Sequence, residues 1–333
     1  MTRQMELRGW VEFDGIVLSN EEISSILIEE PDKISLFGGE FFLKWKSCSA
    51  RDHYGIILGD CPAGEVWCNG RKIRAIEPKS RSLDLHAAIV DSIRMRSEEG
   101  VTALSGGVDS ALVAALAQKP CISVGVEGSH DLKRAGKVAG ELNLPLEIRT
   151  VTSCEIEETI PKVMKIIKDP TPVDLAIATT LFFVAETAHD EGYERILTGQ
   201  GADEVFGGYS RYLGKNEEQL TSTFSADFSS LSRQGIRDQA VAGYHGTWLS
   251  MPYLDIRVVC AASTIPVTEK VSEGVRKRPL REIAARYLSS ETAYYEKKAM
   301  QYGTGIWKEI KRLARQNGYQ NSVSDYMHHI RKA

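Results

Sequence analysis

The sequence predicts an α/β fold in which a small N-terminal β-rich domain precedes a doubly wound parallel sheet. Two observations support this prediction. From Val101 onward, segments typical of strands alternate with segments typical of helices, as in βαβ units with right-handed crossovers. Before about residue 78, short apolar runs instead alternate with clusters of turn residues. We therefore expect a β-rich domain over residues 1–78 and an α/β domain with a helical C-terminal part over residues 79–333.

The N-terminal domain is predicted from two runs that are typical of strands, ISLFGGEFFLKW and YGIILGD, and from a turn-rich stretch, CPAGEVWCNG. The next segment, SLDLHAAIVDSIRMRS, is expected to form a helix. It places Leu85, Ile89 and Ile93 on one face because these residues recur every four positions. This helix is expected to connect the two domains.

The α/β domain is expected to contain strands at VTAL, CISVGVE, LEIRTV and RILTG, with helices at SALVAALAQK and DLKRAGKVAGELN. After about Tyr209 the pattern becomes helical and polar. Ligands of such sheets bind at the carboxyl ends of the strands. Two glycine-rich loops lie at such ends, SGGVDS after VTAL and GQGADEVFGG at the end of RILTG. We therefore expect the functional site at these loops.

Composition excludes several classes of protein. The 333 residues are 42% hydrophobic and 26% charged, and the net charge of -4 provides no global basic field for nucleic acid. Six cysteines, at positions 48, 61, 68, 121, 154 and 260, are too scattered for a disulfide framework, so we expect a reducing, cytoplasmic setting. The N-terminal sequence lacks a secretory pattern and the chain has no run of 18 apolar residues, which indicates neither export nor membrane insertion.

The SGGVDS loop has the chemistry of a phosphate site, although it lacks the lysine of a Walker loop and the spacing of a dinucleotide-binding loop. Glycines allow close approach of the backbone to a phosphate, and the start of the following helix adds partial positive charge. Asp109 would repel a bare phosphate. Its presence is reasonable if a divalent cation lies between the carboxylate and the phosphate.

Two stretches carry a family resemblance. SGGVDS resembles the pyrophosphate loop (PP-loop) of the ATP pyrophosphatases, which cleave ATP between its α and β phosphates, and whose fold is related to the adenine nucleotide α hydrolases. ILTGQGADEVFGGYSRY is similar to the asparagine synthetase signature L-[ST]-G-x-G-[AS]-D-E-[LIV]-F-G-G-Y. The resemblance implies ATP and Mg²⁺ as ligands, with Asp109 and Asp203 holding the metal and contributing to catalysis. The resemblance leaves two roles for Glu204, as a third metal ligand or as a hydrogen-bond acceptor next to the metal ligands.

Weaker matches extend this resemblance. CISVGVEGSHDL is similar to the family strand whose backbone contacts adenine, and KKAMQYGTGIW resembles the region of a family lysine that reaches the ATP phosphates, which makes Lys297 or Lys298 a catalytic candidate. The resemblance thus implies a nucleotide site made of Leu104, Ser105, Gly106, Gly107, Val108, Asp109, Ser110, Val124, Gly125, Val126, Gly199, Gln200 and Gly201.

The sequence also departs from the family. In GTWLSMPYLD the family glutamate falls on Trp248 and the family arginine on Ser250, which puts aspartate amidation in doubt and suggests a larger or less polar acceptor, unless Trp248 is simply a core residue. Position 2 holds Thr2 where glutamine-dependent members carry a catalytic cysteine. GGEFFLKWKSCSARDHYGI resembles the end of a class II glutaminase domain, so the first domain is interpreted as a shortened remnant without glutaminase activity.

The resemblance implies an ATP-dependent amide-forming ligase that adenylates a carboxylate, releases pyrophosphate and transfers the acyl group to ammonia or an amine. The expected partners are these small molecules and no membrane, with a separate glutaminase subunit and a homodimer as open alternatives. Two other functions stay open. A tRNA-modifying enzyme of the same loop type is opposed by the lack of C-x-x-C pairs and of a basic face. A regulatory subunit that binds ATP without turnover is opposed by the intact Asp109 and Asp203.

Overall fold

The computed structural model describes residues 5–79, 84–296, 300–320 and 322–332. It divides into two compact units, neither of which is one continuous stretch of chain. The first unit comprises Met1–Met95, Gln200–Gln239 and Ser250–Lys277, and the second comprises Arg96–Gly199, Ala240–Leu249 and Arg278–Ala333. The acidic residue of the first glycine-rich loop, Asp109, therefore lies in the second unit. Those of the second loop, Asp203 and Glu204, lie in the first unit.

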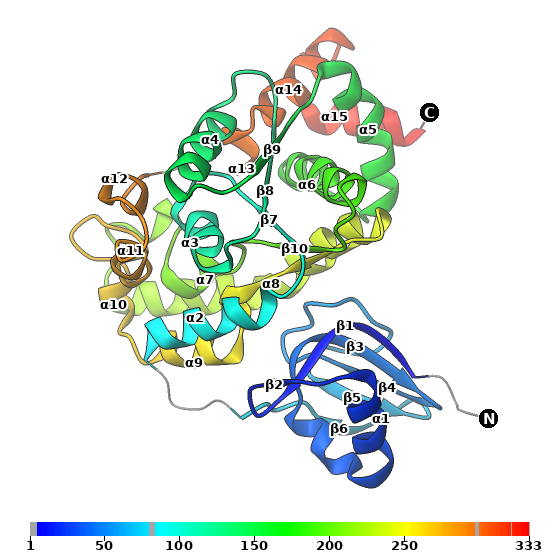
Figure 1. Cartoon of the computed structure of the whole chain (residues 1–333). Coiled ribbons are helices and arrows are strands. Elements are labelled where there is room, and N and C mark those ends of the chain that lie inside the picture. The colour runs from blue at the N-terminus through cyan, green and yellow to red at the C-terminus, as the bar shows by residue number, and fades with distance from the viewer. Residues whose placement is uncertain (1–4, 80–83, 297–299, 321, 333) are drawn as a thin grey trace. The chain divides into compact units, whose positions relative to one another are not determined.

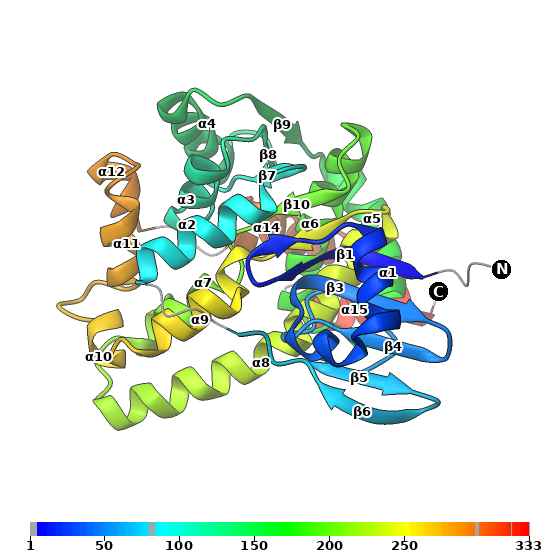
Figure 2. The same ribbon diagram turned by 60° about the horizontal axis from the view of Figure 1, so that its bottom comes forward.

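The first unit contains a six-stranded sheet in the order β2-β1-β3-β4-β5-β6, in which every neighbouring pair is antiparallel (Figures 1 and 2). Its core consists of apolar side chains from the strands together with Ile23, Leu27 and Ile34 from the helical segments between β2 and β3. The strands are β1 Glu6–Phe13, β2 Ile16–Val17, β3 Gly38–Trp45, β4 Cys48–Arg51, β5 Glu65–Cys68 and β6 Arg71–Ala75.

The helical segments α1 (Asn20–Glu29) and η1 (Pro31–Leu36) in this unit have clear local causes. Ser19 and Glu22 form a capping box at the start of α1, and Pro31 begins η1. Two expectations were wrong here. YGIILGD is not a strand, because the buried carboxylate of Asp52 accepts the backbone N–H groups of Ile56 and Ile57 at 2.8 and 3.0 Å. The turn-rich stretch CPAGEVWCNG contains the strand β5.

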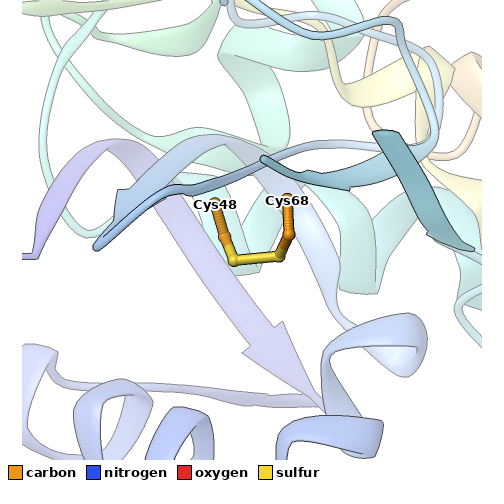
Figure 3. The surroundings of a disulfide bond; sticks show 2 residues. All are labelled: Cys48 and Cys68. Atoms are coloured by element: carbon orange, nitrogen blue, oxygen red, sulfur yellow. A yellow bond between two sulfur atoms is a disulfide. The ribbon is translucent and has the colours of Figure 1, made fainter. Parts of the chain in front are cut away.

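A disulfide joins Cys48 and Cys68 (Figure 3). The two residues face each other across β4 and β5, with 4.0 Å between their Cα atoms. This bond was not expected from the sequence, because a spacing of 20 residues says nothing about the register of two strands. It is a single cross-strand link and not a framework.

The second unit contains a five-stranded sheet in the order β11-β10-β7-β8-β9, and the β10, β7, β8 and β9 neighbours pair in parallel. Helices cover both of its faces, with α3 and α4 on one side and α5, α6 and α14 on the other (Figure 1). This confirms the predicted doubly wound α/β fold. The strands are β7 Val101–Ala103, β8 Cys121–Gly125, β9 Leu146–Thr150, β10 Arg195–Leu197 and β11 Trp248–Ser250, and the helices are α3 Val108–Ala117, α4 His130–Leu142, α5 Ser153–Ile166, α6 Pro172–Asp190 and α14 Ile306–Gln316.

The core of the second unit surrounds α3 and α6. α6 begins at a capping box made by Thr171 and Asp174, with Pro172 at its first turn, and most of its apolar residues after the first turn are buried. Within the described parts of the chain, none of the helices combines the length and the apolar character that a membrane span needs.

The remaining helical segments complete both units. Those that begin in the first unit are α2 Leu85–Arg96, α7 Ala202–Phe206, η2 Ser210–Tyr212, α8 Glu217–Tyr244, η3 Pro252–Leu254, α9 Ile256–Ser263 and α10 Val267–Lys270. Those of the second unit are α11 Arg278–Ala284, α12 Ser290–Ala293, α13 Met300–Gly303 and α15 Val323–Lys332.

Candidate functional site

The SGGVDS loop lies directly after β7 and leads into α3, as predicted. The backbone N–H of Leu104 donates to Ile122 of β8 at 2.8 Å, which fixes the start of the loop to the sheet. Gly106 has a φ of 73°, a conformation that other residues adopt rarely. Gly107 is the N-cap of α3 and supplies no side chain to the first turn. The N–H groups that begin α3 are therefore suited to an anion.

The two serines of this loop hold it in shape. The Ser105 and Ser110 hydroxyls lie 2.9 Å apart, the Ser105 N–H donates to the Ser110 Oγ at 3.1 Å, and the Ser110 hydroxyl donates to the Gly107 carbonyl at 3.2 Å. Ser110 is buried and Ser105 half-buried. A hydroxyl has a single proton to donate, so these contacts organise the loop first and leave the backbone as its main source of donors.

Asp109 lies in the first turn of α3 and is half-buried. The second glycine-rich loop begins beside it. A Cβ on Gly199 would lie 2.7 Å from the Cβ of Asp109 and 2.9 Å from the backbone nitrogen of Ser110. Gly199 is therefore required for close packing of the end of β10 against the start of α3, and the structure brings these three candidate residues together.

The strand expected to contact adenine ends in a tightly packed region. The N–H of Val126 donates to the carbonyl of Thr304 at 2.9 Å, and Val124 is buried. A Cβ on Gly125 would lie 2.5 Å from the Ser129 Oγ and 3.1 Å from the Thr304 carbonyl oxygen. The segment before α14 thus covers the carboxyl end of β8. A side chain at position 125 would collide with Ser129 and Thr304, which explains the glycine.

The rest of the second loop lies in the first unit, where α7 carries its acidic residues. The side-chain amide of Gln200 donates to Asp238 at 2.7 Å. Gly201 has a φ of 84°, and a Cβ there would lie 2.7 Å from the side chain of Leu254. Both residues hold α7 in place against neighbouring segments of the same unit.

Asp203 forms an ion pair with a buried lysine that sequence reasoning missed. Lys277 Nζ lies 2.6 Å from the Asp203 Oδ1, and the Lys277 side chain is 8% exposed while that of Asp203 is 43% exposed. Gly208 makes room for the pair, since a Cβ there would lie 1.6 Å from that oxygen and 2.1 Å from the Lys277 Cε. The pattern around Lys277, GVRKRPL, is a charged stretch that gave no signal of its position.

Glu204 is buried on the other side of α7. Its Oε1 accepts the Tyr209 hydroxyl at 2.5 Å and the Gln234 amide at 3.4 Å. Burial raises the pKa of Glu204, and the hydrogen bond from Tyr209 opposes that rise. This places Glu204 as an acceptor inside the fold.

A second buried lysine, Lys270, was also missed. Its Nζ donates to the carbonyl of Val205 in α7 at 3.1 Å, and burial lowers its pKa to about 8. α7 is thus held by one lysine at its backbone and by Lys277 at its side chain.

Trp248 and Ser250, which stand where the family has glutamate and arginine, both make defined contacts. Trp248, at the start of β11, is half-buried, and the Arg195 guanidinium lies 4.9 Å from the centre of its ring. The Ser250 hydroxyl donates to Glu40 of β3 at 2.6 Å, and the N–H of Met251 donates to the same carboxylate at 2.8 Å. Glu40 is fully buried, so the N-terminal sheet supplies a hydrogen-bond acceptor to the segment that carries Ser250.

Three candidates from the sequence, Lys297, Lys298 and Thr2, lie outside the described residues. Within the residues that are described, no group of three or more histidine, cysteine, aspartate or glutamate side chains forms a metal cluster. Asp109 and Asp203 belong to different units.

Fold and loop geometry together define a doubly wound α/β domain with a glycine-rich loop at the end of its central strand. Comparison with known families identifies it further. The family model described as asparagine synthase matches residues 84–246 and 236–329. The chain therefore belongs to the asparagine synthase family, as the SGGVDS and GQGADEVFGG loops predicted.

Individual relatives agree with this assignment. The chain is 31% identical over 308 residues to a protein described as putative asparagine synthetase [glutamine-hydrolyzing] 1 from Methanocaldococcus jannaschii, over 79% of this chain and 57% of that protein. It is 26% identical over 266 residues to asparagine synthetase B of Escherichia coli, over 70% of this chain and 47% of that protein. The chain thus spans about half the length of these curated relatives.

Among solved structures, an NMN synthetase from Francisella tularensis is similar at 13% sequence identity with a TM-score of 0.29, over 55% of this chain and 94% of that chain.

Proposed function

We propose that this chain is an ATP-dependent carbon-nitrogen ligase. It adenylates a substrate carboxylate, releases pyrophosphate and transfers the acyl group to ammonia or another amine. The observation that supports the proposal most is the SGGVDS loop after β7, where a glycine-rich turn leads directly into the start of α3, which has no side-chain cap. Membership of the asparagine synthase family supports the same reaction class.

The residues present fit ATP and Mg²⁺. Gly106 packs closely against α4 and Gly199 against the start of α3, so both positions exclude side chains from the surroundings of the loop. A phosphate site formed by backbone N–H groups has this character. Asp109 in the first turn of α3 and Asp203 in α7 are hard oxygen ligands of the kind that Mg²⁺ prefers. Bound Mg²⁺ would offset the negative charge of the departing pyrophosphate.

The chain's own groups then have separate tasks. The N–H groups that begin α3 bind phosphate oxygens, and Ser105 with Ser110 keeps the loop in the shape that aims them. Val124 and Gly125 at the end of β8, Val126 after it, and the loop residues from Leu104 to Ser110 hold the nucleotide. Lys297 or Lys298 stabilises the charge that develops as the carboxylate attacks the α phosphate.

The domain and substrate assignments belong to the same proposal. Residues 1–78 form a glutaminase-like domain that supplies no ammonia, so the ammonia is free or comes from a separate glutaminase. The protein acts in the cytoplasm on small molecules. Trp248, stacked against Arg195, replaces the family glutamate. It favours an acceptor that is larger or less polar than aspartate.

The proposal is tested by pyrophosphate release from ATP in the presence of Mg²⁺, ammonium chloride and a mixture of amino acids. Asp109→Ala should lower the rate by about 100-fold or more, the usual cost of losing one group that stabilises charge in the transition state. Asp190→Ala, which removes an exposed carboxylate at the end of α6, is the matched control and should retain the wild-type rate. Equal rates for both variants would overturn the proposed role of the loop.

A further inference from the structure

Arg134 is a buried guanidinium with an unused edge. The residue lies in α4 and is 9% exposed. Its Nη1 lies 3.3 Å from Glu291, an exposed carboxylate. Among the described residues, none accepts a hydrogen bond from the buried Nε or Nη2 of Arg134. Burying such donors without partners is costly, so this edge requires an explanation.

The surroundings hold the guanidinium in one place. It stacks on the ring of Tyr295, 3.8 Å from the ring centre. Tyr295 in turn stacks on His130, the first residue of α4, with 5.8 Å between ring centres, and its hydroxyl contacts the His130 Nε2. Helical side chains point toward the start of their helix, so Arg134 extends toward the carboxyl end of β8.

Arg134 also lies against the SGGVDS loop. A Cβ on Gly106 would lie 2.5 Å from the Cβ of Arg134 and 2.6 Å from its backbone carbon. The loop and this turn of α4 are therefore in direct contact. Ser129, the residue before α4, adds a buried hydroxyl without a hydrogen-bond partner among the described residues. Two kinds of unused donor thus lie near the start of α4, Arg134 beside the loop and Ser129 beside Gly125 of β8.

The chemistry of the unused edge indicates its ligand. Nε and Nη2 form a planar fork that matches two oxygens of one carboxylate or phosphate. Elsewhere in this chain the same edge is used in this way, since Arg257 donates from Nε and Nη2 to the two oxygens of Asp255, each at 2.8 Å. Contact with the glycine loop favours phosphate as the ligand of Arg134.

We infer that Arg134 binds two oxygens of the β or γ phosphate of ATP, and then of the pyrophosphate that leaves. The inference rests on the proposed function, because it assigns a residue to the same loop. Tyr295 acts as a positioning residue by holding the guanidinium plane. Burying the Nε and Nη2 donors without partners has a free-energy cost that phosphate binding removes.

The experiment measures binding of inorganic pyrophosphate with Mg²⁺ to the full chain, alongside ATP and AMP. Arg134→Gln should weaken pyrophosphate and ATP binding by about 10-fold or more, as expected for loss of a bidentate charged contact, and leave AMP binding unchanged. The matched control is Lys137→Gln, which removes another cation that contacts Glu291 from the exposed side of the same helix. It should bind all three probes like the wild type.

Thermal unfolding without ligand separates this role from a structural one. Arg134→Gln should unfold at the same temperature as wild type or higher, and it should lose the stabilisation by pyrophosphate. Wild-type binding of pyrophosphate together with unchanged binding in Arg134→Gln would overturn the inference alone. Weaker AMP binding to the same extent would also overturn it. Wild-type protein that binds none of the three probes would overturn the proposed function, and this inference with it.

Discussion

The glycine-rich loop after β7 and the one after β10 differ in what holds them. In the first, glycine backbone and two serine hydroxyls set the shape, and the start of α3 has no side-chain cap. In the second, charged side chains do so: Asp203 pairs with Lys277, and Glu204 accepts from Tyr209. Both loops contain a glycine at which an added Cβ would clash, Gly106 in the first and Gly208 in the second. The second loop depends on charge in addition, through the pair of Asp203 with Lys277.

The largest effect is expected at Gly106. A methyl group there would collide with Arg134 at a positive φ, so the loop must move. Gly106→Ala should lower pyrophosphate release by about 100-fold, since a shift of about 1 Å in a positioning group is enough for such a loss.

Gly192→Ala is the control, because Gly192 has a φ of 81° and no neighbour within 4 Å of an added Cβ. It should cost about 1 kcal/mol of stability from backbone strain alone and retain activity. If both variants lost activity equally, the steric account of the first loop would be wrong.

An intermediate effect is expected for the pair in the second loop. A double-mutant cycle with Asp203→Asn and Lys277→Met, followed by urea unfolding, should give a coupling energy of about 1 kcal/mol, reduced from that of a fully buried charged hydrogen bond because Asp203 is half-exposed.

The exposed pair Lys33 and Glu30, with 2.7 Å between its charged atoms, provides the comparison. Its coupling should be only a few tenths of a kcal/mol. A coupling for Asp203 and Lys277 no larger than this would show that charge does not hold the second loop.

The smallest effect is expected at Glu204. Its folded pKa is raised, so the folded state binds more protons than the unfolded state above about pH 4.5, and this group's contribution to stability falls as pH rises through the folded pKa. Glu204→Gln should therefore gain stability relative to wild type as pH increases.

Glu22→Gln tests the sign of this argument. The hydrogen bonds from Ser19 lower the pKa of Glu22, so its contribution is present at neutral pH and is lost as pH falls. This variant should lose stability relative to wild type as pH increases. Denaturant titrations across acid and neutral pH measure both trends, and the same direction for the two variants would contradict the assignment of Glu204.

The parallel sheet could be predicted from the sequence, whereas the antiparallel sheet was only partly predicted. Strands and helices alternate one by one from β7 to α5, and this pattern is visible in the sequence. In the first unit, YGIILGD looks like a strand, but the Asp52 carboxylate satisfies its backbone instead. The pairing of Cys48 with Cys68 depends on register, which no local pattern specifies.

The candidate site was predicted where it is local and missed where it is not. The glycine loops carry their spacing in consecutive residues, so SGGVDS and its helix were found directly. Lys277 and Arg134 are distant in sequence from the residues that they contact, Asp203 and Gly106, and come close to them only in the folded chain. No spacing relates Lys277 to Asp203 or Arg134 to Gly106, and both basic residues stand in ordinary charged stretches of sequence.

The central claim is cleavage of ATP between its α and β phosphates. The most direct test follows ATP labelled in its terminal phosphate, incubated with the protein, Mg²⁺, ammonium chloride and mixed amino acids. The account predicts that the label appears in pyrophosphate together with an equal amount of AMP. Label released as inorganic phosphate with ADP, or no consumption of ATP, would contradict it.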